Sequence, residues 1–278
     1  MNFLKPKFWD RNEISFFSIF LLPIALLIKL LSFLKRSLTR SNKFPIPIIC
    51  VGNIYLGGTG KTPLCIEIFS ILKNLNMNPA FIRKRCDSFQ DEVELEKQTG
   101  PIYQSTNRTK AIEEAIQNKT NVAILDDGFQ DFSIEKNLSI ICFNKKQWIG
   151  NGFTIPAGPL REDLSALKKA NCVIINGEKN KDIENKIFSK NEKVKIFYSN
   201  YKPQNINEFQ NKKVVAFAGI GNPENFFDLL KDNNSILLTT EKDYFRISEN
   251  YKKNIKCLKI KIEIENKSQF IEEIKKII

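Results

Sequence analysis

The chain has 278 residues and a mass of 32.1 kDa, enough for one large or two modest domains. Hydrophobic residues make up 42% and charged residues 27%, which excludes a wholly disordered or collagen-like protein. Histidine is absent, so any general base must be a carboxylate, Lys, Tyr or water. The six cysteines form no C-x-x-C pair, which argues against zinc, and most lie in apolar runs, as is typical of a reducing compartment.

The N-terminal part is both apolar and basic. The formal net charge is +12, and residues 1–45 hold half of this excess, with eight Lys or Arg against two acids. Ile14–Leu34 is an apolar segment interrupted by Pro23 and Lys29, and as a helix it would measure roughly 31 Å. Basic residues follow it directly, as expected where a flank faces anionic headgroups. They are Lys35, Arg36, Arg40 and Lys43.

We therefore predict that residues 1–44 form a membrane-associated helix with a basic flank. The sequence leaves open whether the helix spans the bilayer or lies in its interface. A signal peptide and a buried core helix are the remaining alternatives. Elsewhere Lys is spread through the chain without aromatic residues between Arg clusters, so we expect no nucleic-acid partner.

Short apolar runs alternate with helical patterns after residue 44, which predicts βαβ units and a mostly parallel sheet covered on both faces. The predicted fold class is α/β of the P-loop NTPase type, over residues 45–205. The predicted helices are 62–75 and 109–117. The predicted strands are 45–51, 79–82, 122–125, 138–143 and 172–175.

A second, smaller α/β domain is predicted over residues 206–278. Its expected elements are strands at 214–218, 236–238 and 258–264, with a helix near 224–230. The last strand alternates apolar and charged residues, which predicts one solvated face.

A glycine-rich loop follows the first predicted strand and opens the first helix. Glycines let backbone N–H groups converge on phosphate oxygens, a lysine can reach the β- and γ-phosphates, and a threonine hydroxyl can bind Mg²⁺. The loop departs from the strict G-x-x-x-x-G-K-[ST] pattern because Tyr55 stands at the first glycine position. The predicted ATP-binding residues are Gly57, Gly58, Thr59, Gly60, Lys61 and Thr62.

Carboxylates complete the predicted phosphoryl-transfer site. The strand at 122–125 runs into Asp126 and Asp127, as a Walker B strand delivers Asp to the Mg²⁺ of a nucleotide. Asp91 and Glu92 follow the basic stretch 83–85, which could meet anionic groups of an acceptor.

Several motifs in chain order resemble those of the tetraacyldisaccharide 4′-kinase, or lipid A 4′-kinase, family. They are Val51-Gly-Asn with Gly-Gly-Thr-Gly-Lys-Thr-Pro63, Leu125-Asp-Asp-Gly-Phe-Gln130, Gly150-Asn-Gly152, Pro156–Glu162, Gly219-Ile-Gly-Asn-Pro223 and Thr240-Glu-Lys-Asp243. The resemblance implies transfer of the γ-phosphoryl group of ATP to the 4′-hydroxyl of a tetraacylated glucosamine disaccharide 1-phosphate. It also implies a location on the cytoplasmic face of the bacterial inner membrane.

The resemblance also implies roles for particular residues. Catalysis falls to Asp91, the candidate base, with Lys61 and Asp126. Mg²⁺ binding falls to Thr62, Asp127, Glu92 and Glu162.

Three departures from the family pattern bear on activity. Asp131 stands where the family usually has His, and 83–88 replaces a Ser-Arg-Gly-Tyr-Gly string. The segment between Gly219 and Asp243 is shorter and lacks an Asp-His whose His is thought to support the base. We therefore expect a weakened kinase, because a base partner contributes about 10²–10⁴-fold. The alternatives are a membrane-associated P-loop ATPase and an inactive nucleotide-binding remnant.

Overall fold

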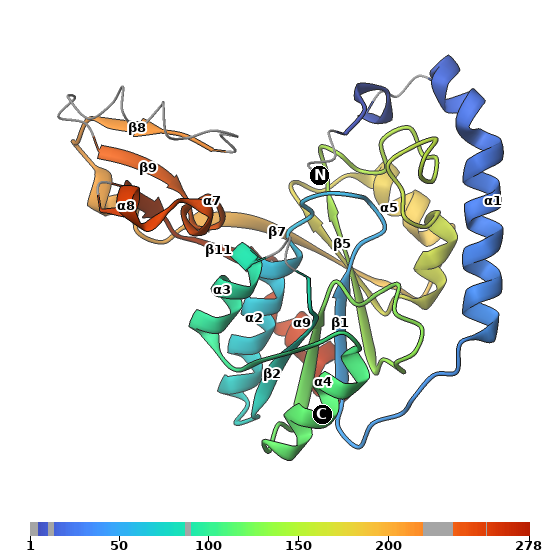
Figure 1. Ribbon diagram of the computed structural model, residues 1–278, viewed down its shortest axis with the longest axis horizontal. Coiled ribbons are helices and arrows are strands. Elements are labelled where there is room, and N and C mark those ends of the chain that lie inside the picture. The colour runs from blue at the N-terminus through green and yellow to red at the C-terminus, as the bar shows by residue number, and fades with distance from the viewer. Residues whose placement is uncertain (1–4, 11–13, 87–89, 219–235, 254) are drawn as a thin grey trace.

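A computed structural model describes residues 5–10, 14–86, 90–218, 236–253 and 255–278. The described chain is built around an eight-stranded sheet with the order β11-β7-β6-β5-β1-β4-β2-β3 (Figure 1). Its neighbouring strands are parallel except β11, which is antiparallel to β7. The strands are β1 (Ile48–Gly52), β2 (Pro79–Lys84), β3 (Ile102–Ser105), β4 (Val122–Asp126), β5 (Leu138–Asn144), β6 (Cys172–Asn176), β7 (Lys195–Pro203) and β11 (Ile260–Ile264).

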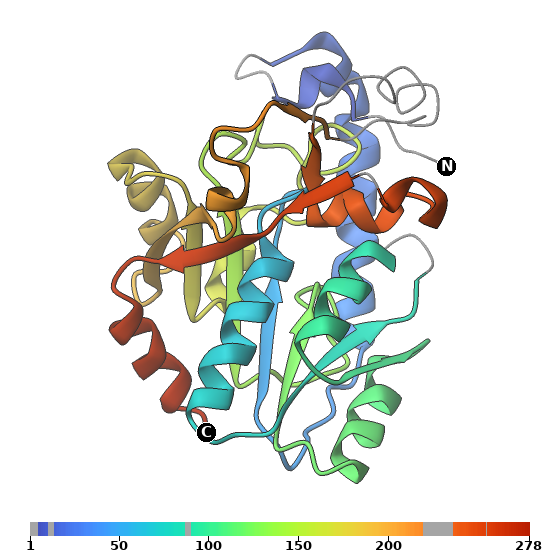
Figure 2. The same ribbon diagram turned by 90° about the vertical axis from the view of Figure 1, so that its left-hand side faces the viewer.

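Both faces of the large sheet are covered, which is why its central strands are continuous apolar runs. Ile48 and Cys50 of β1 pack toward α4 (Arg108–Gln117) and α5 (Lys181–Phe188). Ile49 and Val51 pack toward α2 (Lys61–Asn74) and α9 (Lys267–Lys275), the face seen in Figure 2. α3 (Gln90–Thr99) lies beside α2. The predicted α/β class and the five predicted strands are confirmed.

A three-stranded parallel sheet forms a separate module beyond the edge of the large sheet. Its order is β10-β9-β8, with strands Ile255–Leu258, Ile236–Thr240 and Val214–Ala216. Two short helices, α7 (Glu241–Arg246) and α8 (Glu249–Lys252), belong to the described part of the module. The predicted helix at 224–230 and the motif at 219–223 lie outside the described residues.

The end of the chain differs from the prediction. The expected strand 258–264 of the second domain is two strands, of which β10 joins the small sheet and β11 the large one. Its alternating pattern is confirmed, since Ile262 and Ile264 are buried and the residues between and before them are exposed. An alternating strand can pair at the edge of any sheet that has one solvated face, so the sequence pattern does not say which sheet it joins. Residues 260–278 thus belong with the large sheet.

The two connections to the module run side by side. The Gln204 backbone N–H donates to the Lys259 carbonyl over 2.9 Å. The Asn205 side chain accepts from the Lys259 N–H over 2.9 Å and donates to the Cys257 carbonyl over 3.1 Å. The chain therefore leaves and re-enters the large sheet at one place, where residues 204–205 and 257–259 are joined by hydrogen bonds; we call this place the bonded crossing.

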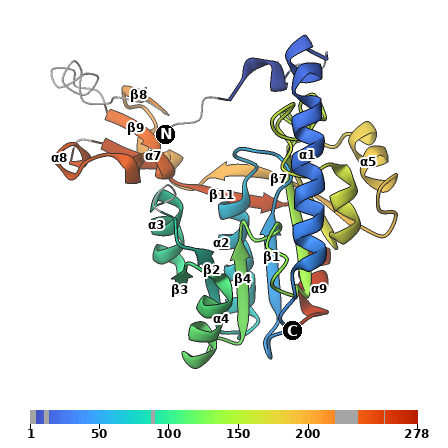
Figure 3. The same ribbon diagram turned by 45° about the vertical axis from the view of Figure 1, so that its right-hand side comes forward.

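Helix α1 (Phe16–Leu38) lies outside the large sheet, on the opposite side of the molecule from the module (Figures 1 and 3). Ser18 and Ala25 are buried against the body, and Lys29 forms an ion pair with Asp163 over 2.5 Å. Most large apolar side chains of α1 are exposed, including Phe20 at 70%. The alternative of a buried core helix is therefore wrong, and by length and composition α1 could cross a membrane.

Candidate active site

The phosphate loop joins β1 to α2 in a conformation that needs glycine. Gly57 and Gly60 have φ values of 143° and 88°, in the region that residues with a Cβ rarely adopt. A Cβ on Gly60 would also lie 2.5 Å from the Tyr201 hydroxyl. No side chain caps the start of α2, so its N-terminal N–H groups face the loop.

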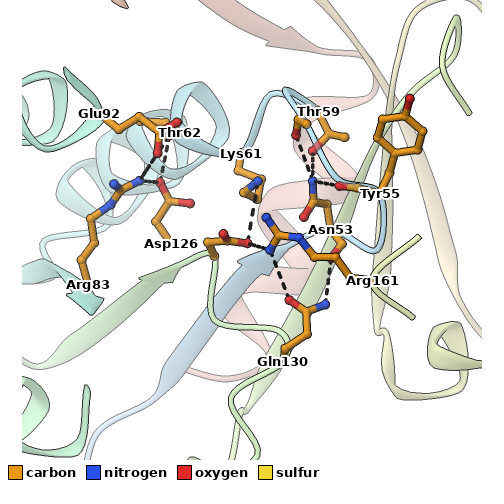
Figure 4. Close-up of polar contacts among 12 residues, drawn as sticks. Asn53, Tyr55, Thr59, Lys61, Thr62, Arg83, Glu92, Asp126, Gln130 and Arg161 are labelled. Carbon is orange, nitrogen blue, oxygen red and sulfur yellow. Dashed lines mark hydrogen bonds and ion pairs between the residues drawn. The ribbon is translucent and has the colours of Figure 1, made fainter. Parts of the chain in front are cut away.

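The buried Asn53 holds the loop from within (Figure 4). Its Nδ2 donates to the carbonyls of Tyr55 and Gly57 over 2.6 and 3.2 Å, and lies 3.1 Å from Thr59 Oγ1. One amide thus fixes three points of the loop. Sequence reasoning did not select Asn53, although it lies inside the quoted Val-Gly-Asn string.

Thr62 and Asp126 meet at the start of α2, as predicted for the metal end of the site. The Thr62 hydroxyl donates to Asp126 Oδ2 over 2.9 Å, and both side chains are buried. Burial tends to raise the pKa of Asp126, but Arg83 and Lys61 outweigh it and the pKa is lowered. Asp126 is therefore ionised. A hydroxyl and a carboxylate are hard oxygen ligands of the kind that suit Mg²⁺, so these residues fit that ion.

Arg83, at the end of β2, links Asp126 to α3 (Figure 4). The guanidinium forms an ion pair with Asp126, and its Nη2 donates to Glu92 Oε2 over 3.0 Å. Its Nε lies 2.8 Å from Glu96 Oε2. Although burial opposes the charged form, these carboxylates raise the pKa of Arg83. The predicted Glu92 is thereby brought beside Asp126.

Asp91 is placed differently from Glu92. It is 4% exposed, and its Oδ2 lies 2.8 Å from Arg246 Nη2 and 3.7 Å from Lys242 Nζ, both on α7. Lys242 also lies 2.7 Å from Glu92 Oε1. Asp91 and Glu92 therefore share Lys242 of the module, but Glu92 also contacts Arg83 whereas Asp91 contacts Arg246.

Asp127 and Glu162 take part in a second set of polar contacts beside the loop, together with Arg161 and Gln130, which Figure 4 labels. Asp127 Oδ1 lies 3.7 Å from Lys61 Nζ and accepts from Arg161 Nη1 over 2.7 Å. Gln130 Nε2 donates to Glu162 Oε1 over 3.1 Å and to the Asn53 carbonyl over 2.9 Å. The described contacts of Glu162 are thus with Gln130 and Lys169, and its role as a Mg²⁺ ligand stays a prediction.

Arg108, at the start of α4, braces the acidic turn after β4. Its Nη2 donates to the Asp127 carbonyl over 2.9 Å, and its Nη1 lies 3.2 Å from Asp131 Oδ2. Burial tends to raise the pKa of Asp131, but bonds from Ser133 and Arg108 lower it. The residue that departs from the family pattern is therefore an ionised partner of Arg108. Sequence reasoning missed Arg108, Gln130 and Arg161, of which the last two lie inside quoted motifs.

A cleft of about 1230 Å³ lies beside the phosphate loop. Its lining includes the phosphate loop, Arg83 of β2, Glu92 of α3, and Asp126 and Asp127 at the end of β4. Residues 240–242 of the module line it as well. A nucleotide with Mg²⁺ would be held by Lys61, Thr62 and Asp126, with arginines nearby to offset phosphate charge.

The family model for tetraacyldisaccharide-1-P 4′-kinase matches residues 17–85 and 87–237. The chain belongs to the tetraacyldisaccharide 4′-kinase family. A tetraacyldisaccharide 4′-kinase of Pelagibacter ubique is 36% identical over 311 residues, covering 100% of this chain and 99% of the relative. That of Rickettsia akari is 30% identical over 319 residues, covering 98% and 96%.

The fold agrees with that of a solved family member. The structure of LpxK from Aquifex aeolicus in complex with ATP matches with a TM-score of 0.73 at 21% identity. The match covers 94% of this chain and 99% of that one. The predicted tetraacyldisaccharide 4′-kinase resemblance is confirmed, and it extends over the module as well as the large sheet.

Proposed function

We propose that this protein is an ATP-dependent lipid kinase that phosphorylates the 4′-hydroxyl of a tetraacylated glucosamine disaccharide 1-phosphate, a step in making lipid A. The observation that carries the proposal is the cleft in which the phosphate loop, the Thr62–Asp126 pair and Glu92 of α3 lie together. The identity of the acceptor comes from membership of the family.

Phosphoryl transfer depends mainly on positioning and charge stabilisation. The loop N–H groups and Lys61 would hold the β- and γ-phosphates. Thr62 and Asp126 would hold Mg²⁺, which would offset charge that develops on the phosphate oxygens. Arg161 is held beside Lys61 because both side chains contact Asp127. These groups fix the γ-phosphate for attack.

Asp91 is the proposed acceptor of the hydroxyl proton, and Glu92, Asp127 and Glu162 are proposed to assist Mg²⁺. In a chain without histidine, the described cations beside Asp91 are Arg246 and Lys242. General acid–base catalysis loses part of its contribution when the base has no histidine partner, but phosphoryl transfer depends mainly on positioning and charge stabilisation. We therefore propose transfer at a reduced rate.

The acceptor's acyl chains remain in the membrane, so the enzyme has to work at its surface. The exposed apolar face of α1 and the basic residues after it support binding to the cytoplasmic face of the inner membrane.

The test is an assay with labelled ATP, Mg²⁺ and the disaccharide 1-phosphate in detergent micelles. We expect a bisphosphorylated lipid, and Lys61→Ala should lower kcat by about 10²–10³-fold, as loss of one preorganised charge contact does. Lys73→Ala is the matched control, an exposed lysine in the last turn of the same helix, and should leave kcat unchanged.

Three results would contradict the proposal. Undiminished turnover by Lys61→Ala would remove the phosphate-loop mechanism. Release of inorganic phosphate without a lipid product would favour the ATPase alternative. Binding of Mg²⁺-ATP without any turnover would favour the inactive remnant.

A further inference from the structure

Three cationic side chains surround one aromatic ring beside α1. Around Phe132, Lys169 Nζ lies 4.6 Å from the ring centroid, Arg36 Cζ 5.1 Å and Lys136 Nζ 5.8 Å. The cations come from separate elements: the last turn of α1, the loop between β4 and β5, and the 3-10 helix Leu164–Lys169. We call Phe132 with these three residues the Phe132 cluster. Its ring face attracts cations, but the cations repel one another.

Little anionic charge from the described residues offsets the cluster. Glu162 lies 3.5 Å from Lys169 and is shared with Gln130. Asp131 is engaged by Arg108 and Ser133, and Lys136 Nζ donates to the carbonyls of Phe129 and Asp131 over 3.1 and 2.7 Å. Burial lowers the pKa of both lysines. At Lys169 the charge of Glu162 opposes this shift, and Arg36 and Lys136 add to it, so the pKa stays lowered. An anion at this place would therefore relieve repulsion.

The cluster lies between the apolar helix and the cleft. On one side, Leu34 and Leu38 of α1 are exposed at 46% and 86%. On the other, polar contacts run from Lys169 through Glu162, Gln130 and Arg161 to Asp127, which lies beside Lys61. A lipid whose acyl chains lie on α1 and whose sugars follow this row of polar contacts would place an anionic group at the far end of its sugars beside the Phe132 cluster.

We propose that the Phe132 cluster binds the phosphomonoester of the acceptor, at the end of the disaccharide opposite the hydroxyl that is phosphorylated. This inference rests on the proposed function for the identity of the acceptor. The chemistry it requires is a phosphate beside acyl chains, which a membrane phospholipid also offers, so the experiment has to separate these two sources.

The experiment compares two acceptors that differ by the phosphate alone: the disaccharide 1-phosphate and the same disaccharide with a free 1-hydroxyl. Lys169→Met should raise KM for the phosphorylated acceptor about tenfold, the loss expected for a hydrogen bond between charged groups. KM for the free-hydroxyl acceptor and for ATP should not change. Lys168→Met, an exposed neighbour, is the matched control. Arg36→Gln should also raise KM for the phosphorylated acceptor. Because Arg36 is exposed at the end of α1, this substitution should not disturb the packing of the large sheet.

Two results would overturn the proposal. If Lys169→Met raises KM equally for both acceptors, the cluster does not recognise the phosphate, although the kinase activity would stand. If Lys169→Met weakens binding to acceptor-free phosphatidylglycerol vesicles by as much as it raises KM, the cluster binds phospholipid instead.

A binding measurement separates this inference from the proposed function. Fluorescent forms of both acceptors are titrated with the full chain in micelles, without ATP. Tighter binding of the phosphorylated form, lost in Lys169→Met, would support the cluster even if no transfer occurred. Equal binding of the two forms by the unmodified protein would contradict it.

Discussion

Glu96 is a carboxylate of α3 with no exposed surface, beside Arg83 and Asp126. Burial raises its pKa well above the ordinary value, and the charge of Asp126 raises it further, against the opposing effect of Arg83. The folded protein therefore keeps a proton on Glu96 at pH values where the unfolded chain has released it. Since the native state then binds more protons, this group makes stability fall as pH rises above about 4.5.

Glu96→Gln should remove this dependence. We expect the free energy of unfolding of the unmodified protein to fall between pH 5 and 8 more steeply than that of the variant, by up to about 1.4 kcal/mol per pH unit. Urea unfolding at several pH values measures both slopes. Glu94→Gln, an exposed residue of the same helix, is the control and should leave the slope unchanged. Parallel slopes for the unmodified protein and Glu96→Gln would contradict the shifted pKa.

The residues of the site divide into those that sequence can reveal and those that it cannot. Thr62 was predictable because it follows a glycine-rich phosphate loop, and Asp126 because it ends an apolar strand as a Walker B aspartate does. Arg83 was noted as part of a basic stretch, but its contacts depend on how α3 approaches β2, which no local pattern records. The same holds for Asp91, whose partners lie about 150 residues further along the chain.

Among the elements, α1 shows how a charge fits into an apolar helix. Ser18, Ala25 and Lys29 are spaced seven and four residues apart, so they share the face toward the body. Lys29 therefore pairs with Asp163 on the body, and the outer face of α1 stays apolar. The sequence correctly predicted the helix, but the charge inside it could be interpreted only once its partner was known.

Exposed side chains of α1 should determine membrane binding. Leu27→Glu and Leu31→Glu together should lower the partition onto vesicles by at least tenfold, because each exposed apolar side chain that enters the membrane contributes about 1.5–3 kcal/mol. Flotation with liposomes measures this partition. Ile206→Glu is the matched control, since Ile206 is 48% exposed but lies outside α1. An unchanged partition of the double variant would show that α1 is not the binding element.

At the scale of the whole molecule, ion pairs between α3 and α7 join the module to the large sheet. Arg246 and Lys242 contact Asp91 and Glu92, and Glu92 also contacts Arg83. The position of the module is thus coupled to the groups around Asp126. Sequence patterning could not predict this coupling, nor the return of β11 to the large sheet, because both depend on contacts between distant segments.

A double-mutant cycle should measure the interaction between Arg246 of the module and Asp91 of α3. Arg246→Ala and Asp91→Asn should give a coupling energy of about 1 kcal/mol, because Asp91 is buried whereas Arg246 is half-exposed. Amide exchange in α7 should also accelerate in Arg246→Ala. The pair Lys275–Glu272, exposed on both sides, is the reference, with an expected coupling of about 0.3 kcal/mol. Equal couplings would indicate that the module is held by other contacts.

The bonded crossing at Gln204 and Lys259 makes the module an insertion at the outermost strands of the large sheet. A chain segment that departs and returns at one place can lose or gain residues while every strand of its host keeps its neighbours. A change of length in the inserted part can thus leave the strand order of the large sheet intact, while the wall that the module contributes to the cleft changes.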